Sequence, residues 1–127
     1  MAKTEKRRKA QRIPYEIVQS IGAAEDKKAL DIVLLDLRKA GAFADYFLLC
    51  SGANARQIRA IADAVKEAVE GAGSKPAHVE GYDRSEWVLL DYFDFIVHIF
   101  APETRRFYGL ERLWGNAERV EPASSAD

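Results

Sequence analysis

The chain has 127 residues, of which 48% are hydrophobic, and this suits one globular domain with one core rather than a disordered protein. The only cysteine, Cys50, excludes an internal disulfide and a cluster of thiolate metal ligands. No apolar run approaches the roughly 18 residues that a membrane-spanning helix needs, and the charged residues 1–12 do not look like a secretory signal. We therefore expect a cytoplasmic protein that does not enter a membrane.

Charge is distributed unevenly along the chain. Residues 1–12 contain six Lys or Arg and one acidic residue, whereas residues 13–127 contain thirteen basic and nineteen acidic residues and carry a net charge of −6. An acidic domain suits a basic protein partner better than a phosphate backbone, because opposite potentials steer encounter. We expect residues 1–12 to form a disordered basic tail, and the alternative is an arm that makes a weak contact with ribosomal RNA.

In the first half of the chain, helical and strand patterns alternate. A helix is predicted over residues 14–28, with a proline in its first turn. Nearly continuous apolar runs at 30–37 and 44–51 are typical of interior strands that are covered on both faces. The clearest helix spans 54–70, and Gly71 ends it. The apolar residues at helical spacing are Ile17, Ile21 and Ala24 in the first helix and Ile58, Ile61, Ala62, Val65 and Val69 in the second.

The second half predicts strands at 78–80, 86–91 and 95–100, with a hairpin turn at 92–94. A final helix begins at Pro102. The residues expected along one side of this helix are Phe107, Leu110, Leu113 and Trp114.

The order α-β-β-α-β-β-β-α predicts a single α/β domain over residues 13–119. We expect a mixed sheet of about five strands with flanking helices, followed by a disordered tail at 120–127.

One candidate for chemistry is the Ser51-Gly52 turn between a buried strand and a helix. The flanking glycine pattern of a nucleophile elbow is absent, and no pair of closely spaced carboxylates follows to hold two metal ions. The start of the following helix could bind an anion through free N–H groups. The simpler interpretation is that Ser51 or Asn54 caps the helix and Gly52 permits the turn.

Histidines suggest a second candidate. His78, Glu80 and His98 could be drawn as a metal triad, but no fixed spacing supports one, so we expect no metal and no cofactor. His98 lies in an alternating strand, where its neighbours point to the other face. This position is typical of a structural histidine whose ring is satisfied by hydrogen bonds.

Aromatic residues give the clearest signal for binding, since eight of them fall within 28 positions. We expect Phe100 and Phe107 to lie in the core. Alternation along the strand places Trp87 and Leu89 on one sheet face and the intervening apolar residues on the other. If the helices cover the other face, a partner must cover the Trp87 face, and tryptophan and tyrosine dominate interface hot spots. The predicted partner-binding residues are Glu80, Trp87, Leu89, Asp91, Arg105 and Tyr108.

Motifs in this region and before it resemble the ribosomal silencing factor (RsfS, Iojap) family over roughly residues 14–118. The matching blocks are Asp45-Tyr46-Phe47, Ser51-Gly52, Arg56-Gln57, Glu80-Gly81, Trp87-Val88-Leu89-Leu90-Asp91, His98-Ile99-Phe100 and Arg106-Phe107-Tyr108-Gly109-Leu110-Glu111-Arg112-Leu113-Trp114. Family members usually carry Gly-Asp after the tryptophan strand, whereas this chain has Phe93-Asp94.

The resemblance implies a fold related to nucleotidyltransferases but without their activity. It also implies a homodimer that binds ribosomal protein fourteen of the large ribosomal subunit and sterically blocks association with the small subunit, so that translation is repressed. The alternative from another class is a nucleotidyltransferase-like enzyme that acts at the Ser51-Gly52 turn.

Overall fold

A computed structural model describes residues 13–120, so both predicted tails, apart from Val120, lie outside the described residues. The described strands form one sheet of six, in the order β3-β4-β5-β2-β1-β6. β2 and β5 are parallel, and the other neighbouring pairs are antiparallel. The strands are β1 (Leu30–Asp36), β2 (Tyr46–Ser51), β3 (His78–Glu80), β4 (Trp87–Asp91), β5 (Phe95–Phe100) and β6 (Glu118–Val120). The predicted mixed α/β fold is confirmed, with one strand more than expected.

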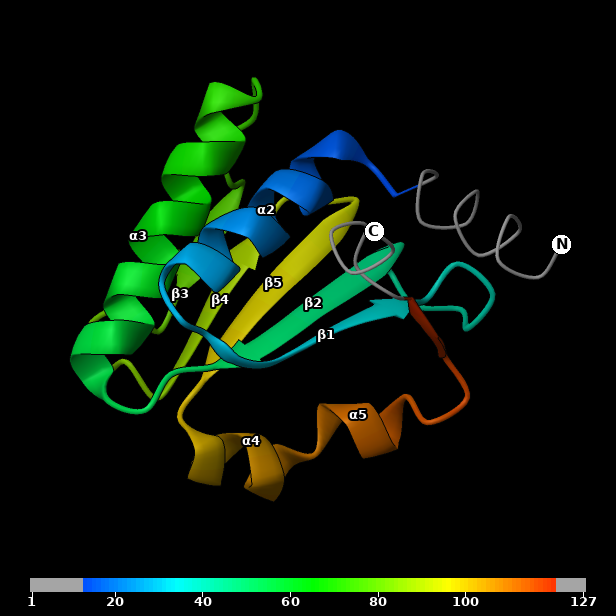
Figure 1. Cartoon of the computed structure of the whole chain (residues 1–127). Coiled ribbons are helices and arrows are strands. Elements are labelled where there is room, and N and C mark those ends of the chain that lie inside the picture. Colours follow the sequence, from blue (N-terminus) through cyan, green and yellow to red (C-terminus); the bar gives the residue numbers. More distant parts are fainter. Residues whose placement is uncertain (1–12, 121–127) are drawn as a thin grey trace, which may run out of the picture.

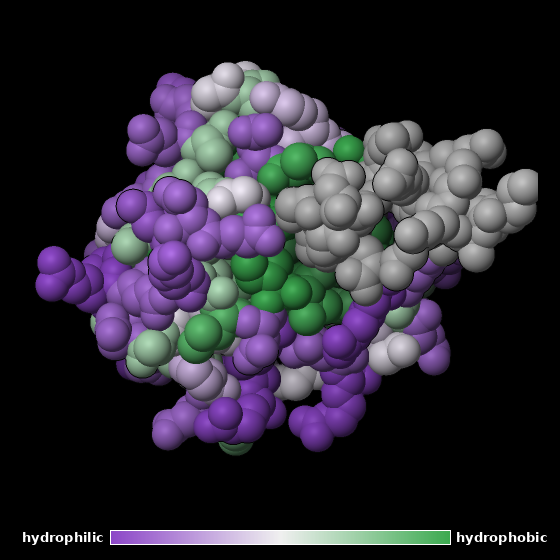
Figure 2. Space-filling model, in the orientation of Figure 1, coloured by the Kyte–Doolittle hydropathy of each residue, from purple (hydrophilic) through white to green (hydrophobic). Residues whose placement is uncertain are grey.

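Helices lie on both sides of the sheet (Figure 1). α2 (Tyr15–Asp26) and α3 (Ala55–Gly71) cover the first face, and α4 (Pro102–Tyr108) and α5 (Leu110–Leu113) lie against the second face. Seen from the same side, hydrophobic residues gather in the middle of the view, between more hydrophilic helical layers (Figure 2). Within residues 13–120, no helix is both long and apolar enough to cross a membrane.

The first face carries the main core. β2 and β5 are buried along almost their whole length, as predicted for the 44–51 run. α3 forms because its apolar residues fall on one stripe, and the Asn54 side chain caps its start by accepting a hydrogen bond from the backbone N–H of Gln57. The largest side chains fully buried on this face are Ile17, Leu34, Leu48, Ile58, Ile61, Leu90 and Ile99.

β1 differs from the prediction that it is buried on both faces. Its first half is exposed, because β6 pairs only with residues 34–36 and a bulge interrupts the pairing with β2 between Leu30 and Val33. Asp31 has a φ of 50° within this bulge. β6 was not predicted, and its last residue, Val120, was assigned to the tail.

The predicted final helix is broken in two. Gly109 adopts a left-handed conformation with a φ of 57° and turns the chain between α4 and α5. Phe107 and Leu113 are therefore 79% and 71% exposed, while Leu110 and Trp114 pack against the sheet. The expectation of one continuous helix was wrong, as was the placement of Phe107 in the core; that of Phe100 is confirmed.

Candidate interaction surface

An aromatic cluster lies on the second face, where α4 and α5 meet the sheet. The Trp87 ring lies 5.0 Å from Phe100 and 4.9 Å from Tyr108, measured between ring centroids. Trp87 is half-buried and Tyr108 is 53% exposed. The full cluster is Phe47, Trp87, His98, Phe100, Tyr108 and Trp114. The chain's own α4 thus contacts Trp87, which corrects the expectation that only a partner covers it.

Next to this cluster, β3 and β4 carry an acidic strip. Glu80 is paired with Leu89, and His78 is paired with Asp91, so these side chains emerge on the same face as Trp87. Glu80 is exposed, and Leu89 and Asp91 are half-buried. No helix of the described chain has an extensive contact with this part of the second face. The candidate surface therefore runs along β3 and β4 to α4, and its members are Glu80, Trp87, Leu89, Asp91 and Tyr108.

Arg105, the sixth predicted residue, lies beneath this surface. Its side chain is only 10% exposed, its Nη1 donates to Ser51 Oγ at 3.0 Å, and its Nε donates to Glu111 Oε1 at 2.8 Å. Glu111 also pairs with Arg119 at 3.2 Å. The guanidinium thus joins α4 to β2 and α5. We propose that Arg105 contributes to binding indirectly, by holding α4 and therefore Tyr108 in place.

His98 occupies the middle of the second face and is 3% exposed. Its Nδ1 accepts a hydrogen bond from Trp87 Nε1 at 3.0 Å. Burial lowers the pKa of His98 to about 3, so the ring is neutral near pH 7. His98 is buried as a structural histidine would be, but the expectation that hydrogen bonds satisfy its whole ring is wrong, since Nε2 has no hydrogen-bond partner among the described residues. The sequence analysis missed the Trp87–His98 pair, and the shared face of the two residues was the signal that could have revealed it.

Comparison with known proteins identifies the family of the chain. The family model described as "Ribosomal silencing factor during starvation" matches residues 10–127. The chain belongs to the ribosomal silencing factor (RsfS) family. The RsfS of Bacillus subtilis is 42% identical over 95 residues, covering 75% of this chain and 80% of the relative. The RsfS of Halalkalibacterium halodurans is 39% identical over 107 residues, covering 84% and 92%.

A solved structure supports the same RsfS fold. The crystal structure of a Chromobacterium violaceum protein matches with a TM-score of 0.76 at 35% identity, covering 79% of this chain and 83% of that one. A more distant mouse relative, 27% identical over 103 residues, covers 79% of this chain and 45% of its own length. The mouse protein is named "Mitochondrial assembly of ribosomal large subunit protein 1".

The Ser51-Gly52 turn of this RsfS-family chain is built as a helix cap. Asn54 Oδ1 accepts from Gln57 N at 2.9 Å, and Gln57 Oε1 accepts from Ala53 N at 2.6 Å. Ser51 is buried, and its Oγ accepts the hydrogen bond from Arg105. A Cβ at Gly52 would lie 2.8 Å from the side chain of Ile58, so the glycine permits close packing. The capping interpretation is confirmed, with Asn54 as the capping residue.

The three side chains drawn as a metal triad do not come together as one group. His78 and Glu80 bond to each other at 2.7 Å on the exposed edge strand, while His98 bonds to Trp87 in the interior. Within the described range 13–120, no group of three His, Cys, Asp or Glu side chains is arranged to hold a metal ion.

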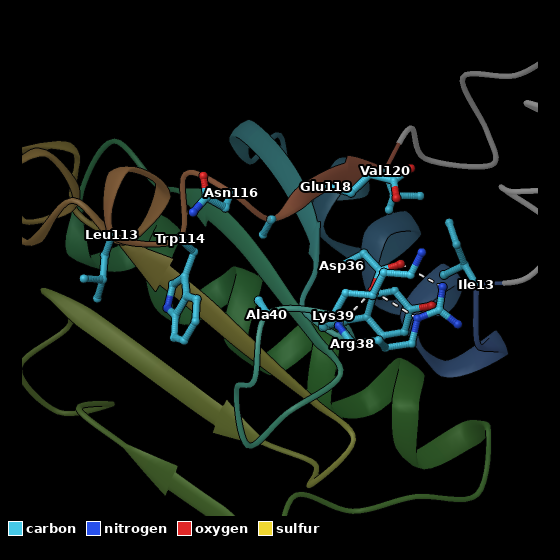
Figure 3. Close-up of a pocket in the computed structure, with 12 residues that line it drawn as sticks. Ile13, Asp36, Arg38, Lys39, Ala40, Leu113, Trp114, Asn116, Glu118 and Val120 are labelled. Carbon is cyan, nitrogen blue, oxygen red and sulfur yellow. Dashed lines mark hydrogen bonds and ion pairs between the residues drawn. The ribbon is translucent and has the colours of Figure 1, made fainter.

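A cavity of about 860 Å³ lies beside α5 and β6 (Figure 3). Trp114 lines one end, and the ion pair of Asp36 with Arg38 lines the other. The Arg38 side chain keeps the pKa of the Asp36 carboxyl below its usual value, and the guanidinium also lies 5.4 Å over the ring of Tyr46. The charges of Asp36 and Arg38 are therefore already paired with each other.

The turn between β4 and β5 holds a non-glycine residue in a left-handed conformation. Phe93 has a φ of 69° and is 76% exposed, and its N–H donates to Asp91 Oδ1 at 2.8 Å. The left-handed region favours glycine because it has no Cβ. The turn therefore holds a residue that is poorly suited to its conformation.

Proposed function

We propose that this chain represses translation by binding the large ribosomal subunit at ribosomal protein fourteen and blocking its association with the small subunit. Membership of the silencing-factor family supports the translational role, and the name of the mouse relative supports the large subunit. The choice of protein fourteen and the steric block follow from the family resemblance. Steric obstruction needs only occupancy of the surface that the small subunit must reach, so no catalytic step is required.

The observation that carries the proposal is a half-buried Trp87 whose ring contacts an exposed Tyr108 at the end of an acidic strip. Tryptophan and tyrosine supply much of the binding energy in protein interfaces. Glu80 and Asp91 on the same face suit a basic partner, because complementary charges favour encounter and fix orientation. A stable contact of this kind buries roughly 1,600 Å² in total.

The proposal predicts that Trp87→Ala weakens binding to purified large subunits by about 2 kcal/mol or more, which is roughly 30-fold in Kd. Binding is measured by co-sedimentation or by interferometry with immobilised subunits. Phe43→Ala is the matched control, since Phe43 is a fully exposed aromatic residue outside the candidate surface. Circular dichroism and thermal unfolding establish that both variants are folded. Unchanged binding by a folded Trp87→Ala variant would exclude this surface.

The steric block is tested separately with reconstituted subunits. A saturating concentration of the chain is expected to lower the yield of joined ribosomes in a sucrose gradient, whereas Trp87→Ala at the same concentration is not. If subunits join equally well with and without the wild-type chain, the blocking mechanism is wrong even where binding is observed.

Three further parts of the proposal concern partners and location. We propose that the free chain is a homodimer, as the family resemblance implies, and analytical ultracentrifugation measures this directly. We also propose that residues 1–12 add a weak contact with ribosomal RNA. Their removal is then expected to cause a modest loss of affinity that shrinks as salt is raised. A cytoplasmic location accords with a ribosomal target and is tested by cell fractionation.

A further inference from the structure

His98 is an unusual residue for the interior of a sheet. It lies on β5 in the row that joins Leu49 of β2 and Leu89 of β4, and Phe47 contacts it edge-on with 4.6 Å between ring centroids. The ring is stacked with Phe100 at 5.9 Å. Its hydrogen-bonding partner is Trp87, whose Nε1–H donates to Nδ1.

The direction of this hydrogen bond fixes the state of the histidine. Because Nδ1 accepts, the neutral ring must carry its hydrogen on Nε2. Nε2 is buried without a hydrogen-bond partner among the residues that the structure describes. A buried donor that loses its water without gaining an acceptor destabilises the fold. A leucine of similar volume would avoid this cost but would leave the Nε1–H of Trp87 without its acceptor, so the hydrogen bond to Trp87 is what the histidine provides.

The histidine supplies an acceptor that no aliphatic residue offers. The Trp87 indole is half-buried and its ring contacts those of Phe100 and Tyr108, but these ring contacts do not engage the Nε1–H group. A directed bond from Nε1 to His98 selects one orientation. Phe47 and Phe100 hold the His98 ring in place, and the ring stays neutral. Its Nδ1 is therefore a fixed acceptor that determines how the indole is oriented.

We propose that His98 is a positioning residue, which holds the Trp87 indole in the orientation that the binding partner recognises. The inference depends on the proposed function, in which Trp87 contacts the large subunit. A side chain that is already ordered loses less conformational freedom when a complex forms, so affinity is higher than for a free indole. The role is indirect, since the ring of His98 is itself inaccessible.

The first test observes the indole directly. The chain has two tryptophans, Trp87 and Trp114, so a ¹⁵N–¹H spectrum contains two indole resonances, and Trp114→Phe assigns them. We expect His98→Leu to move the Trp87 resonance and to raise its hydrogen-exchange rate by about tenfold, since the acceptor is lost. His98→Asn is the conservative rescue, because its Oδ1 can take the position of Nδ1, and it is expected to restore slow exchange.

The second test measures affinity for purified large ribosomal subunits with the same variants. His98→Leu is expected to bind about tenfold more weakly, and His98→Asn within about threefold of wild type. Val97→Ala is the control for general destabilisation, because Val97 lies on the same strand but faces the first-face core. It is expected to lower the unfolding temperature without moving the Trp87 resonance or the affinity.

The outcomes separate this inference from the proposed function. If His98→Leu changes neither the Trp87 indole resonance nor its hydrogen-exchange rate, His98 does not position Trp87. This conclusion holds whether or not the chain binds the large subunit. If His98→Leu changes the Trp87 resonance but binds large subunits with wild-type affinity, the orientation of the indole does not affect recognition of the partner. If the wild-type chain itself does not bind large subunits, the proposed function fails, and the spectra still decide whether His98 orients Trp87.

Discussion

The two faces of the sheet are built on different principles. The first face meets two helices through side chains that are almost all apolar and fully buried, such as Leu48 and Ile61. The second face meets two short helices through a smaller apolar cluster that includes Leu49 and Phe100. Aromatic rings, a partly buried arginine and a tryptophan–histidine hydrogen bond surround that cluster. The acidic strip beside them has no extensive helical cover within the described chain.

This difference indicates a division of labour. Apolar packing on the first face is non-directional, and its free energy scales with the area removed from water. The polar contacts on the second face are directional, so they fix the positions of a few groups more than they add stability. We infer that the first face holds the fold together and that the second face presents an ordered surface to a partner.

The largest predicted effect compares the same substitution on the two faces. Leu48→Ala is expected to lower the free energy of unfolding by about 3 kcal/mol, because it leaves a cavity among fully buried side chains. Leu89→Ala, at a half-buried position on the candidate surface, is expected to lose less than about 1.5 kcal/mol. Urea denaturation measures both. Equal losses would contradict the proposed division, since the candidate surface would then contribute to stability as much as the core does.

A smaller effect arises from the buried histidine on the second face. His98 has a pKa of about 3 in the folded chain against 6.5 as an ordinary histidine, so the unfolded state binds more protons between these values. Stability is therefore lost as the pH falls below about 6.5. Between pH 7 and pH 5.5 we expect the wild type to lose about 1.3 kcal/mol more than His98→Leu.

The measurement is urea denaturation of both proteins at the two pH values. The pKa of the Asp36 carboxyl is also lowered, and this group loses stabilisation as the pH falls through its folded pKa. Asp36 is present in both proteins, so its contribution cancels in the difference. Parallel losses in wild type and variant would show that His98 does not stay neutral in the fold.

The sequence predicted the first face better than the second. Helical spacing and apolar runs identified α3, β2 and β5, because those elements are buried by the regular pattern of their own residues. β6 was missed because three residues, two of them charged, carry no strand signal of their own and pair only where β1 is available. The break between α4 and α5 depends on a single glycine in a left-handed conformation.

The candidate site shows the same limit. Alternation along β4 correctly grouped Trp87, Leu89 and Asp91 on one face, since this rule needs only the strand. The alternation rule could not show that Arg105 donates a hydrogen bond to Ser51, which lies 54 positions away. Such a contact depends on how α4 packs against the sheet. Whether the grouped residues bind the partner remains a prediction that the Trp87→Ala experiment tests.

The smallest predicted effect concerns the turn at residues 92–94, which joins β4 to β5. Phe93→Gly is expected to raise the free energy of unfolding by about 1 kcal/mol, because glycine adopts the φ of 69° without a Cβ clash and the exposed ring packs little. Phe93→Ala is the control, since it removes the ring but keeps the Cβ, and no gain is expected. Equal gains for both variants would show that the exposed ring of Phe93 causes the destabilisation. A gain for glycine alone would show that the strained backbone of the hairpin turn causes it.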